Sequence, residues 1–140
     1  MGYVRKVLVV ISVIMCLVPV SAMAADHTTL NSSNIEAFIG IFPEYKAFLE
    51  NYGENASEDG VDPAMGLKMK NELDGLCAKY GMTMPEFTEL AQKVSMGYSA
   101  LQMRNSGMDP NAMNLMQMVS EEEVSALKPY EARLNDIFNE

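Results

Sequence analysis

Methionine is the residue type in this chain whose chemistry and spacing stand out most. Thirteen of the 140 residues are methionine. Three of them, Met113, Met116 and Met118, lie close together in the run MNLMQM. Thioethers are soft ligands that suit Cu(I), and several sulfurs converging on one point make a site for that ion. These three methionines are therefore a candidate soft-metal site.

Two other roles fit the same residues. The methionine side chain is flexible and polarizable, so it can fill gaps in a small core or form an adaptable apolar surface for a partner protein. On a helix, Met113 and Met116 share a face, whereas Met118 points away from Met116, which favours a surface over a convergent metal site. The predicted partner surface comprises Met103, Met108, Met113, Met116 and Met118.

The residues needed for most catalytic mechanisms are missing. His27 is the single histidine, and the sequence contains neither Gly-x-Gly-x-x-Gly nor a Gly-Lys-Ser/Thr phosphate loop. Glu44 and Glu86 could form a catalytic pair, but each is explained as a first-turn residue of a helix. We therefore predict a non-enzymatic protein without a cofactor, and a hydrolase that uses paired carboxylates is the alternative.

An acidic stretch follows the first third of the chain. Asn55-x-Ser57-x-Asp59-Gly60 matches the first half of a calcium-binding loop, but position twelve of that template is Gly66 instead of glutamate. We therefore expect residues 53–62 to form a solvated loop without calcium.

Helical spacing and capping signals recur along the chain, and no strand-like alternation does. Thr83 with Glu86 predicts a capping box, and Ser120 precedes three glutamates that favour the positive end of a helix dipole. Asn31 is the expected N-cap of the first helix, with a box from Ser33 as the alternative. Helices are predicted over residues 31–42, 43–52, 62–80, 83–106, 109–118 and 120–138.

Glycines and prolines mark the expected ends of these helices. Gly53, Gly81 and Gly107 suit the left-handed residue that follows a helix. Pro43 should end or kink one helix, and Pro129 should kink or split another. Because none of these helices can bury its apolar face alone, the fold class predicted is an all-α bundle of five to six amphipathic helices.

The first 24 residues have the pattern of a cleaved secretory signal peptide. Arg5 and Lys6 precede an apolar run of 14 residues, from Val7 to Val20, and Ala22-Met23-Ala24 forms a small-x-small cleavage site. The run is too short to span a bilayer, which takes about 20 residues. We expect cleavage after Ala24, export to the periplasm, and one all-α domain over residues 25–140 whose residues 25–30 are flexible.

Charge and cysteine content narrow the class of partner. Without the signal peptide, eight basic and nineteen acidic residues remain, a net charge of −11. Such an acidic chain is unsuited to nucleic acid or to an anionic membrane surface, and its charge favours a monomer, with a dimer as the alternative. Cys16 leaves with the signal peptide, so Cys77 is alone and is predicted to be a buried structural thiol.

The segment LNSSNIEAFIGIFP at residues 30–43, the helix start at residues 83–87 and the closing segment 120–138 resemble small exported helical proteins of Gram-negative bacteria. The resemblance implies a helical fold and no catalytic residue. The expected function is binding or protein interaction through the Met-rich apolar surface, with an unknown protein partner. A Cu(I)-binding protein that uses Met113, Met116 and Met118 is the alternative.

Overall fold

The computed structural model describes residues 26–55 and 62–139, and every regular element in these two ranges is helical. The α-helices are α2 (Ser32–Asn55), α3 (Pro63–Ala78), α4 (Met84–Asn105), α5 (Glu121–Leu127) and α6 (Glu131–Asn139). Short 3-10 segments join them: η1 (Pro110–Met113), η2 (Leu115–Gln117) and η3 (Lys128–Tyr130). The all-α prediction is confirmed for these residues.

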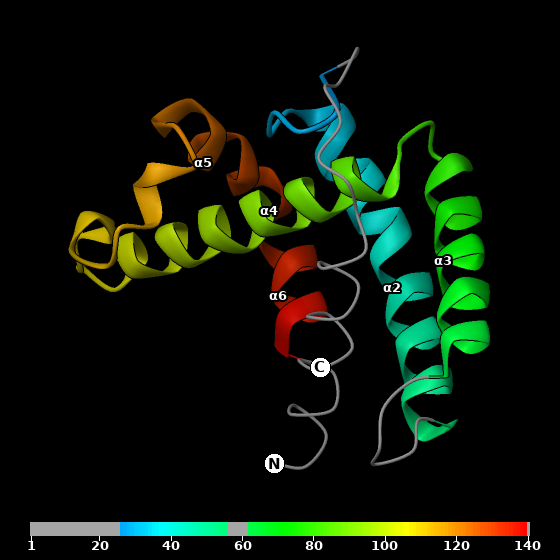
Figure 1. Cartoon of the computed structure of the whole chain (residues 1–140). Helices are drawn as coiled ribbons and strands as arrows, with labels where there is room; N and C mark the ends of the chain where they lie inside the picture. The colour runs from blue at the N-terminus through cyan, green and yellow to red at the C-terminus, as the bar shows by residue number, and fades with distance from the viewer. Residues whose placement is uncertain (1–25, 56–61, 140) are drawn as a thin grey trace.

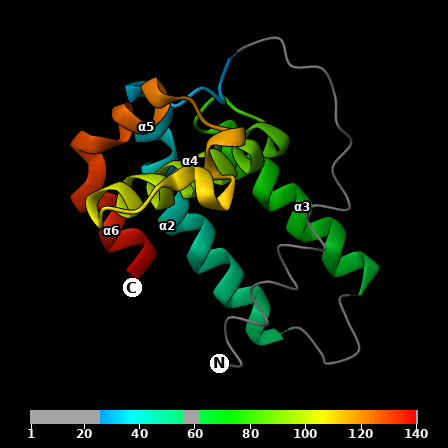
Figure 2. The same cartoon turned by 90° about the vertical axis from the view of Figure 1, so that its left-hand side faces the viewer.

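Helix α4 is the central element of the fold. It crosses one end of the hairpin formed by α2 and α3, and the chain then folds back so that α5 lies along α4 (Figure 1). Helix α6 descends next to α2, and it contacts α2 directly. Seen from the side, the hairpin of α2 and α3 extends past the other helices as an arm (Figure 2).

The core lies where α2, α4, α5 and α6 meet, and Leu73 and Cys77 of α3 also belong to it. Its largest fully buried side chains include Phe38, Phe87, Leu90, Leu127 and Leu134. Phe38 stacks on Phe87 with ring centroids 6.3 Å apart, and on Phe138 of α6 at 6.2 Å. Burial of each such side chain contributes about 2 kcal/mol, which exceeds what the intrinsic helix preference of any one segment supplies.

A second, smaller apolar cluster joins the far ends of α2 and α3. It consists of Leu49, Tyr52 and Met69, each at most 9% exposed. The Tyr52 hydroxyl donates to Glu72 Oε2 at 3.0 Å, which ties the two helices across this cluster. The arm of the molecule is therefore held by its own apolar contacts.

Helix α2 runs through Pro43 without ending, which corrects the prediction of separate helices over 31–42 and 43–52. Proline removes one backbone hydrogen bond, but the segments on both sides of it pack against the same core cluster. Gly53 lies inside α2, so it does not take the left-handed role expected of it. Apolar burial on both sides of the proline thus outweighs the local preference for a break.

The capping predictions are confirmed where the structure describes them. Thr83 with Glu86 and Ser120 with Glu123 form capping boxes, and Asp62 caps α3. Asn31 caps α2, with its Oδ1 accepting from the Asn34 amide at 2.9 Å, which decides between the two alternatives for this helix. The left-handed residues after α3 and α4 are glycines, at φ of 75° and 76°.

Fewer long helices are present than the five to six expected. Four helices of nine residues or more carry the described fold, and α5 adds one of seven residues. Two predicted helices merge into α2, and the predicted Met-rich helix is replaced by η1 and η2. Pro129 splits the last predicted helix through the 3-10 segment η3, as expected.

Residues 26–30 are anchored, although we expected the start of the exported chain to be flexible. Leu30 is 3% exposed, and its amide donates to Glu123 Oε1 at 3.1 Å. Asn34 Nδ2 donates to the Thr29 carbonyl at 2.8 Å. The predicted signal peptide lies outside the described residues. Among the described helices, none is both long and apolar enough to cross a membrane.

Candidate interaction surface

Most of the exposed large apolar side chains of the described residues lie on one segment. Five large apolar residues are exposed, and three of them belong to the predicted partner surface: Met108 at 56%, Met113 at 67% and Met118 at 43%. The other two members, Met103 and Met116, are half-buried. These five methionines are called the Met surface below. Exposed apolar groups that cluster in this way are typical of binding sites.

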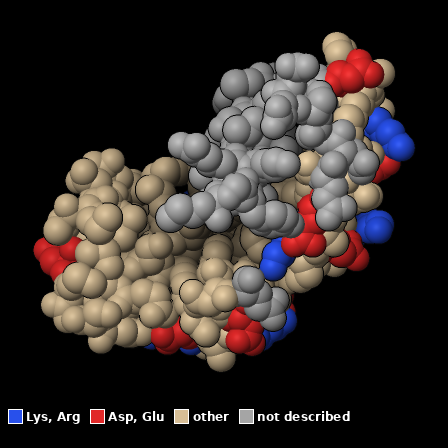
Figure 3. Space-filling view, turned by 90° about the horizontal axis from the view of Figure 1, so that it is seen from below, with Lys and Arg blue, Asp and Glu red and all other residues tan. Residues whose placement is uncertain are grey.

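The Met surface lies at the end of the molecule opposite the α2–α3 arm. Figure 1 shows the yellow segment of η1 beyond the C-terminal end of α4. Seen from below, the lobe on the same side carries few charged side chains (Figure 3). The methionines therefore lie next to a part of the surface that is poor in charge.

The backbone under these methionines differs from the predicted short α-helix. Asp109 caps η1 by accepting from the Asn111 amide at 2.9 Å. Asn114 then takes a left-handed conformation, at φ of 56°, and separates η1 from η2. The spacing argument that placed Met113 and Met116 on one α-helical face does not apply to this backbone, because 3-10 turns and a left-handed residue change the direction of successive side chains.

An arginine from α4 holds this segment against the rest of the fold. Arg104 Nη2 lies 2.6 Å from Glu121 Oε1 and 3.7 Å from Met116 Sδ. A guanidinium next to the Met116 sulfur disfavours a second cation at the same atom, because like charges repel. This contact weakens the case for Cu(I) at Met113, Met116 and Met118, since one of the three sulfurs already faces a positive group.

Glu123, in the first turn of α5, anchors the chain just after the Met-rich segment. Its Oε1 lies 2.5 Å from Lys93 Nζ, and its Oε2 accepts from the Ser120 amide at 2.9 Å. The same carboxylate accepts from the buried amide of Leu30. Burial alone would raise the pKa of Glu123, but the hydrogen bonds from Lys93 and two backbone amides outweigh it and lower the pKa below its usual value. This carboxylate thus joins α4, α5 and the start of the described chain.

Cys77 is a structural thiol, as predicted. It is 1% exposed, and its Sγ lies 3.4 Å from Met84 Sδ in the core. Burial, assisted by Asp74, raises the pKa of this thiol to about 12. The reactive thiolate is therefore scarce at neutral pH, and Cys77 is not a candidate nucleophile.

The two glutamates considered as a catalytic pair, Glu44 and Glu86, differ in their surroundings. Glu86 is buried, and its Oε2 accepts from the Thr83 amide at 2.8 Å as part of a capping box, whereas Glu44 is exposed on α2. Within residues 26–55 and 62–139, no group of three or more histidine, cysteine or carboxylate side chains is placed to hold a metal ion. Residues 56–61, which include most of the matched first half of the calcium-like loop, lie outside the described residues.

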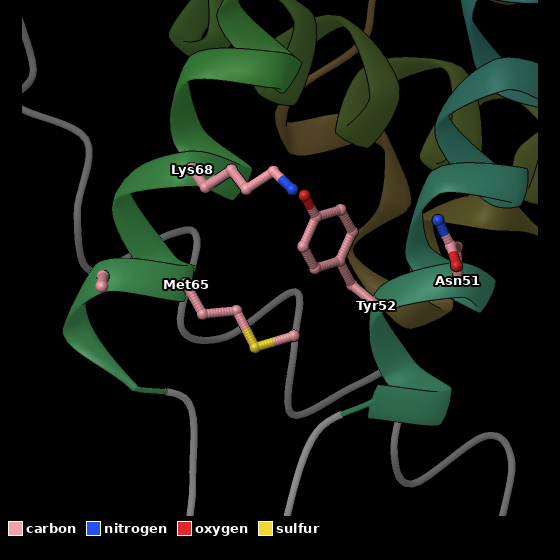
Figure 4. Close-up of a pocket in the computed structure, with 5 residues that line it drawn as sticks. Asn51, Tyr52, Met65 and Lys68 are labelled. Atoms are coloured by element: carbon pink, nitrogen blue, oxygen red, sulfur yellow. The ribbon is translucent and has the colours of Figure 1, made fainter.

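A shallow pocket of about 430 Å³ lies between the end of α2 and the start of α3. Figure 4 shows the Tyr52 ring extending from α2 towards Lys68 on α3, with Met65 below it. The pKa of Tyr52 is raised by burial and by its hydrogen bond to Glu72. The pocket is shallow and none of the exposed large apolar side chains lines it, so we consider it a weaker candidate for partner binding than the Met surface.

Comparison with known proteins adds no relative from which to transfer a function. No protein-family model matches the chain, and neither a curated protein nor a solved structure matches it.

Sequence reasoning missed the two residues that support the Met surface from α4. Arg104 and Lys93 have no sequence pattern that links them to Glu121 and Glu123, which lie 17 and 30 residues further along the chain. The capping box at Ser120 was visible in the sequence, but its second use as an ion-pair partner depends on how α4 and α5 pack. A tertiary contact therefore gives these residues their role.

Proposed function

We propose that this chain is an exported, non-enzymatic interaction protein whose Met surface binds a partner protein. The observation that carries the proposal is that three methionines of one segment, Met108, Met113 and Met118, are exposed to solvent. Methionines of the core, by contrast, are at most 5% exposed: Met69, Met82 and Met84. A chain of this size can bury its apolar side chains, so exposed methionines confined to one segment support a binding role.

The way the segment is supported is consistent with this role. Asp109 caps η1, and Pro110, its first residue, is buried. Arg104 contacts Met116 and Glu121, and Glu123 contacts Lys93, so the residues that follow η1 are held against α4. The backbone is thus held while the long thioether side chains remain free to adapt to a guest. Adaptable side chains on an ordered backbone suit the binding of apolar groups of varied shape.

Export is part of the same proposal. Arg5 and Lys6, the 14-residue apolar run and the Ala22-Met23-Ala24 site support removal of residues 1–24 in the periplasm. The mature protein would then act as an acidic monomer in that compartment. Mass measurement of the protein recovered from a periplasmic fraction tests this directly, and recovery of the full-length chain would contradict it.

Site-specific photo-crosslinking in living cells tests the interaction. One variant carries a photo-reactive residue in place of Met113, and a matched control carries it in place of Leu67, which is 61% exposed on α3. We expect a discrete crosslinked protein from position 113 and none from position 67. Equal crosslinking from both positions, or none from position 113, would refute binding at the Met surface.

A further inference from the structure

We infer that the guest of the Met surface is a basic amphipathic helix of a partner protein. This inference rests on the proposed function and adds the chemical class of the partner. Two observations point to it: the exposed thioethers offer an apolar contact, and the few charges near them that are not in ion pairs, on Asp109 and Glu122, are negative. A guest that fits both must present apolar side chains on one face and positive ones beside them.

The charge around the Met surface is negative by count and by pairing. From residue 103 to residue 123 the chain has one basic residue, Arg104, and four acidic ones: Asp109, Glu121, Glu122 and Glu123. Arg104 is paired with Glu121 and Lys93 with Glu123, so the two ion pairs cancel, and Asp109 and Glu122 carry the net negative charge of this segment. Over residues 26–55 and 62–139 together, eight basic residues face sixteen acidic ones.

This excess of acidic residues favours a positively charged partner. Lysines and arginines on a guest would be attracted to the acidic field and would associate faster, whereas an acidic guest would be repelled. The attraction acts between exposed charges, so it should weaken as salt is added. An anionic lipid surface is disfavoured by the same field.

The spread of the exposed methionines favours a guest that binds through one face of a helix over a guest that inserts a single side chain. The thioethers of Met108, Met113 and Met118 extend from separate positions along the backbone, so they offer several adaptable contacts in place of one shaped pocket. A helix presents apolar residues at spacings of three and four along a stripe, which such contacts can follow. Leu67, which is also strongly exposed, is the one exposed large apolar residue of α3.

Binding of a designed peptide tests the inference. The probe is a synthetic amphipathic helix of leucine and lysine, about five turns long, with one tryptophan on its apolar face. The protein contains no tryptophan, so the fluorescence reports on the peptide alone. The protein is expressed from its full sequence in bacteria and purified in the form that the cells produce, with any signal-peptide cleavage already complete. We expect a blue shift on binding, with a dissociation constant in the range of about 1–10 µM.

Matched variants and a matched peptide separate the two contributions. Replacing Met108, Met113 and Met118 together by glutamine should weaken binding about tenfold or more, and Leu67→Gln should leave it unchanged. These side chains are exposed, so both variants should keep the circular dichroism spectrum of the parent. A peptide with glutamate in place of lysine should bind at least about tenfold more weakly, and added salt should reduce that difference.

Several results would overturn the inference. They are absence of binding by the basic peptide, equal binding of both peptides, and binding that the triple glutamine variant does not weaken. Self-association of the free protein that this variant abolishes would assign the surface to a second copy instead. Binding to anionic vesicles through the same methionines would assign it to a membrane. If crosslinking from position 113 still captures a protein while the basic peptide fails, the partner class is wrong and the proposed function stands.

Discussion

Glu123 is the residue whose removal most directly tests how the fold supports the Met surface. Its carboxylate accepts hydrogen bonds from Lys93, from the Ser120 amide and from the Leu30 amide, and its side chain is 11% exposed. Glu123→Ala removes all of these contacts at once. The loss of the cap costs about 1 kcal/mol, and the unsatisfied buried amide costs about 1–3 kcal/mol.

Lys93 adds to this cost because its side chain is 13% exposed and loses its partner. Removal of one member of a buried ion pair typically costs about 3–5 kcal/mol. These costs overlap because they arise from one carboxylate, so we expect Glu123→Ala to lower the free energy of unfolding by about 3–5 kcal/mol, which corresponds to a fall in Tm of about 10–20 °C for a chain of this size. Thermal and urea unfolding followed by circular dichroism at pH 7 measure both quantities.

Glu122→Ala is the matched control, because Glu122 lies in the same helical turn and is exposed. It should cost less than about 0.5 kcal/mol. Lys93→Met completes a double-mutant cycle with Glu123→Ala, and the expected coupling is about 1–3 kcal/mol. A loss from Glu123→Ala no larger than that from Glu122→Ala, with no coupling to Lys93, would refute the role assigned to this carboxylate.

The pH dependence of the same variant has a definite sign. The pKa of Glu123 is lower in the folded protein than the ordinary value of 4.5. Its contribution to stability is therefore fully present above pH 4.5 and is lost as the pH falls through the folded-state pKa. The difference in stability between the parent protein and Glu123→Ala should be constant near neutral pH and should shrink below about pH 4.5. A difference that grows in acid would contradict this reasoning.

Three further outcomes are expected. Gly97→Ala should lower the free energy of unfolding, measured with a chemical denaturant, by about 1–3 kcal/mol, because the added Cβ would lie 2.6 Å from Leu127 Cδ1 in the core. Gly40→Ala should be tolerated, because the nearest neighbour of its added Cβ is the ring of Tyr80, which is 38% exposed and can move. Graded treatment with hydrogen peroxide, followed by peptide mass mapping, should convert the exposed methionines of the Met surface to sulfoxides well before the buried methionines of the core. Anaerobic Cu(I) titration against a competing chelator should show no site tighter than about 1 µM, since Arg104 faces one of the candidate sulfurs.

Each of these outcomes can also fail in an informative way. Equal losses from the two alanine variants would mean that α4 and α5 do not approach as closely as the Gly97 contact indicates. Oxidation of buried and exposed methionines at one rate would mean that the core opens readily. A tight Cu(I) site that disappears on replacing Met113 or Met118 would restore the copper alternative.

Local sequence signals predicted much of the helical framework. Asp62, Thr83 and Ser120 begin helices as their capping chemistry requires, and Gly81 and Gly107 end them in the left-handed conformation. These predictions succeeded because a cap depends on atoms within three or four residues of one another. The candidate surface was also named from the sequence, since the methionines cluster along the chain itself.

Predictions that depended on packing were less accurate. Of the two outcomes expected at Pro43, an end or a kink, the end is wrong, because α2 continues through the proline with residues on both sides buried against one core. The Met-rich segment was expected to be one helix, and it is two 3-10 turns separated by Asn114. In both cases the competing conformations differ by a few kcal/mol, which tertiary contacts exceed.

The sequence by itself determined the helical class, the helix starts and the group of methionines, because each depends on residue type and short spacing. Only the tertiary structure decided which methionines are exposed, that Arg104 faces Met116, and that Glu123 joins Lys93 to the Leu30 amide. These features join residues separated by 12 to 93 positions along the chain, so no local pattern records them. They arise when apolar burial brings α4, α5 and the start of the described chain together.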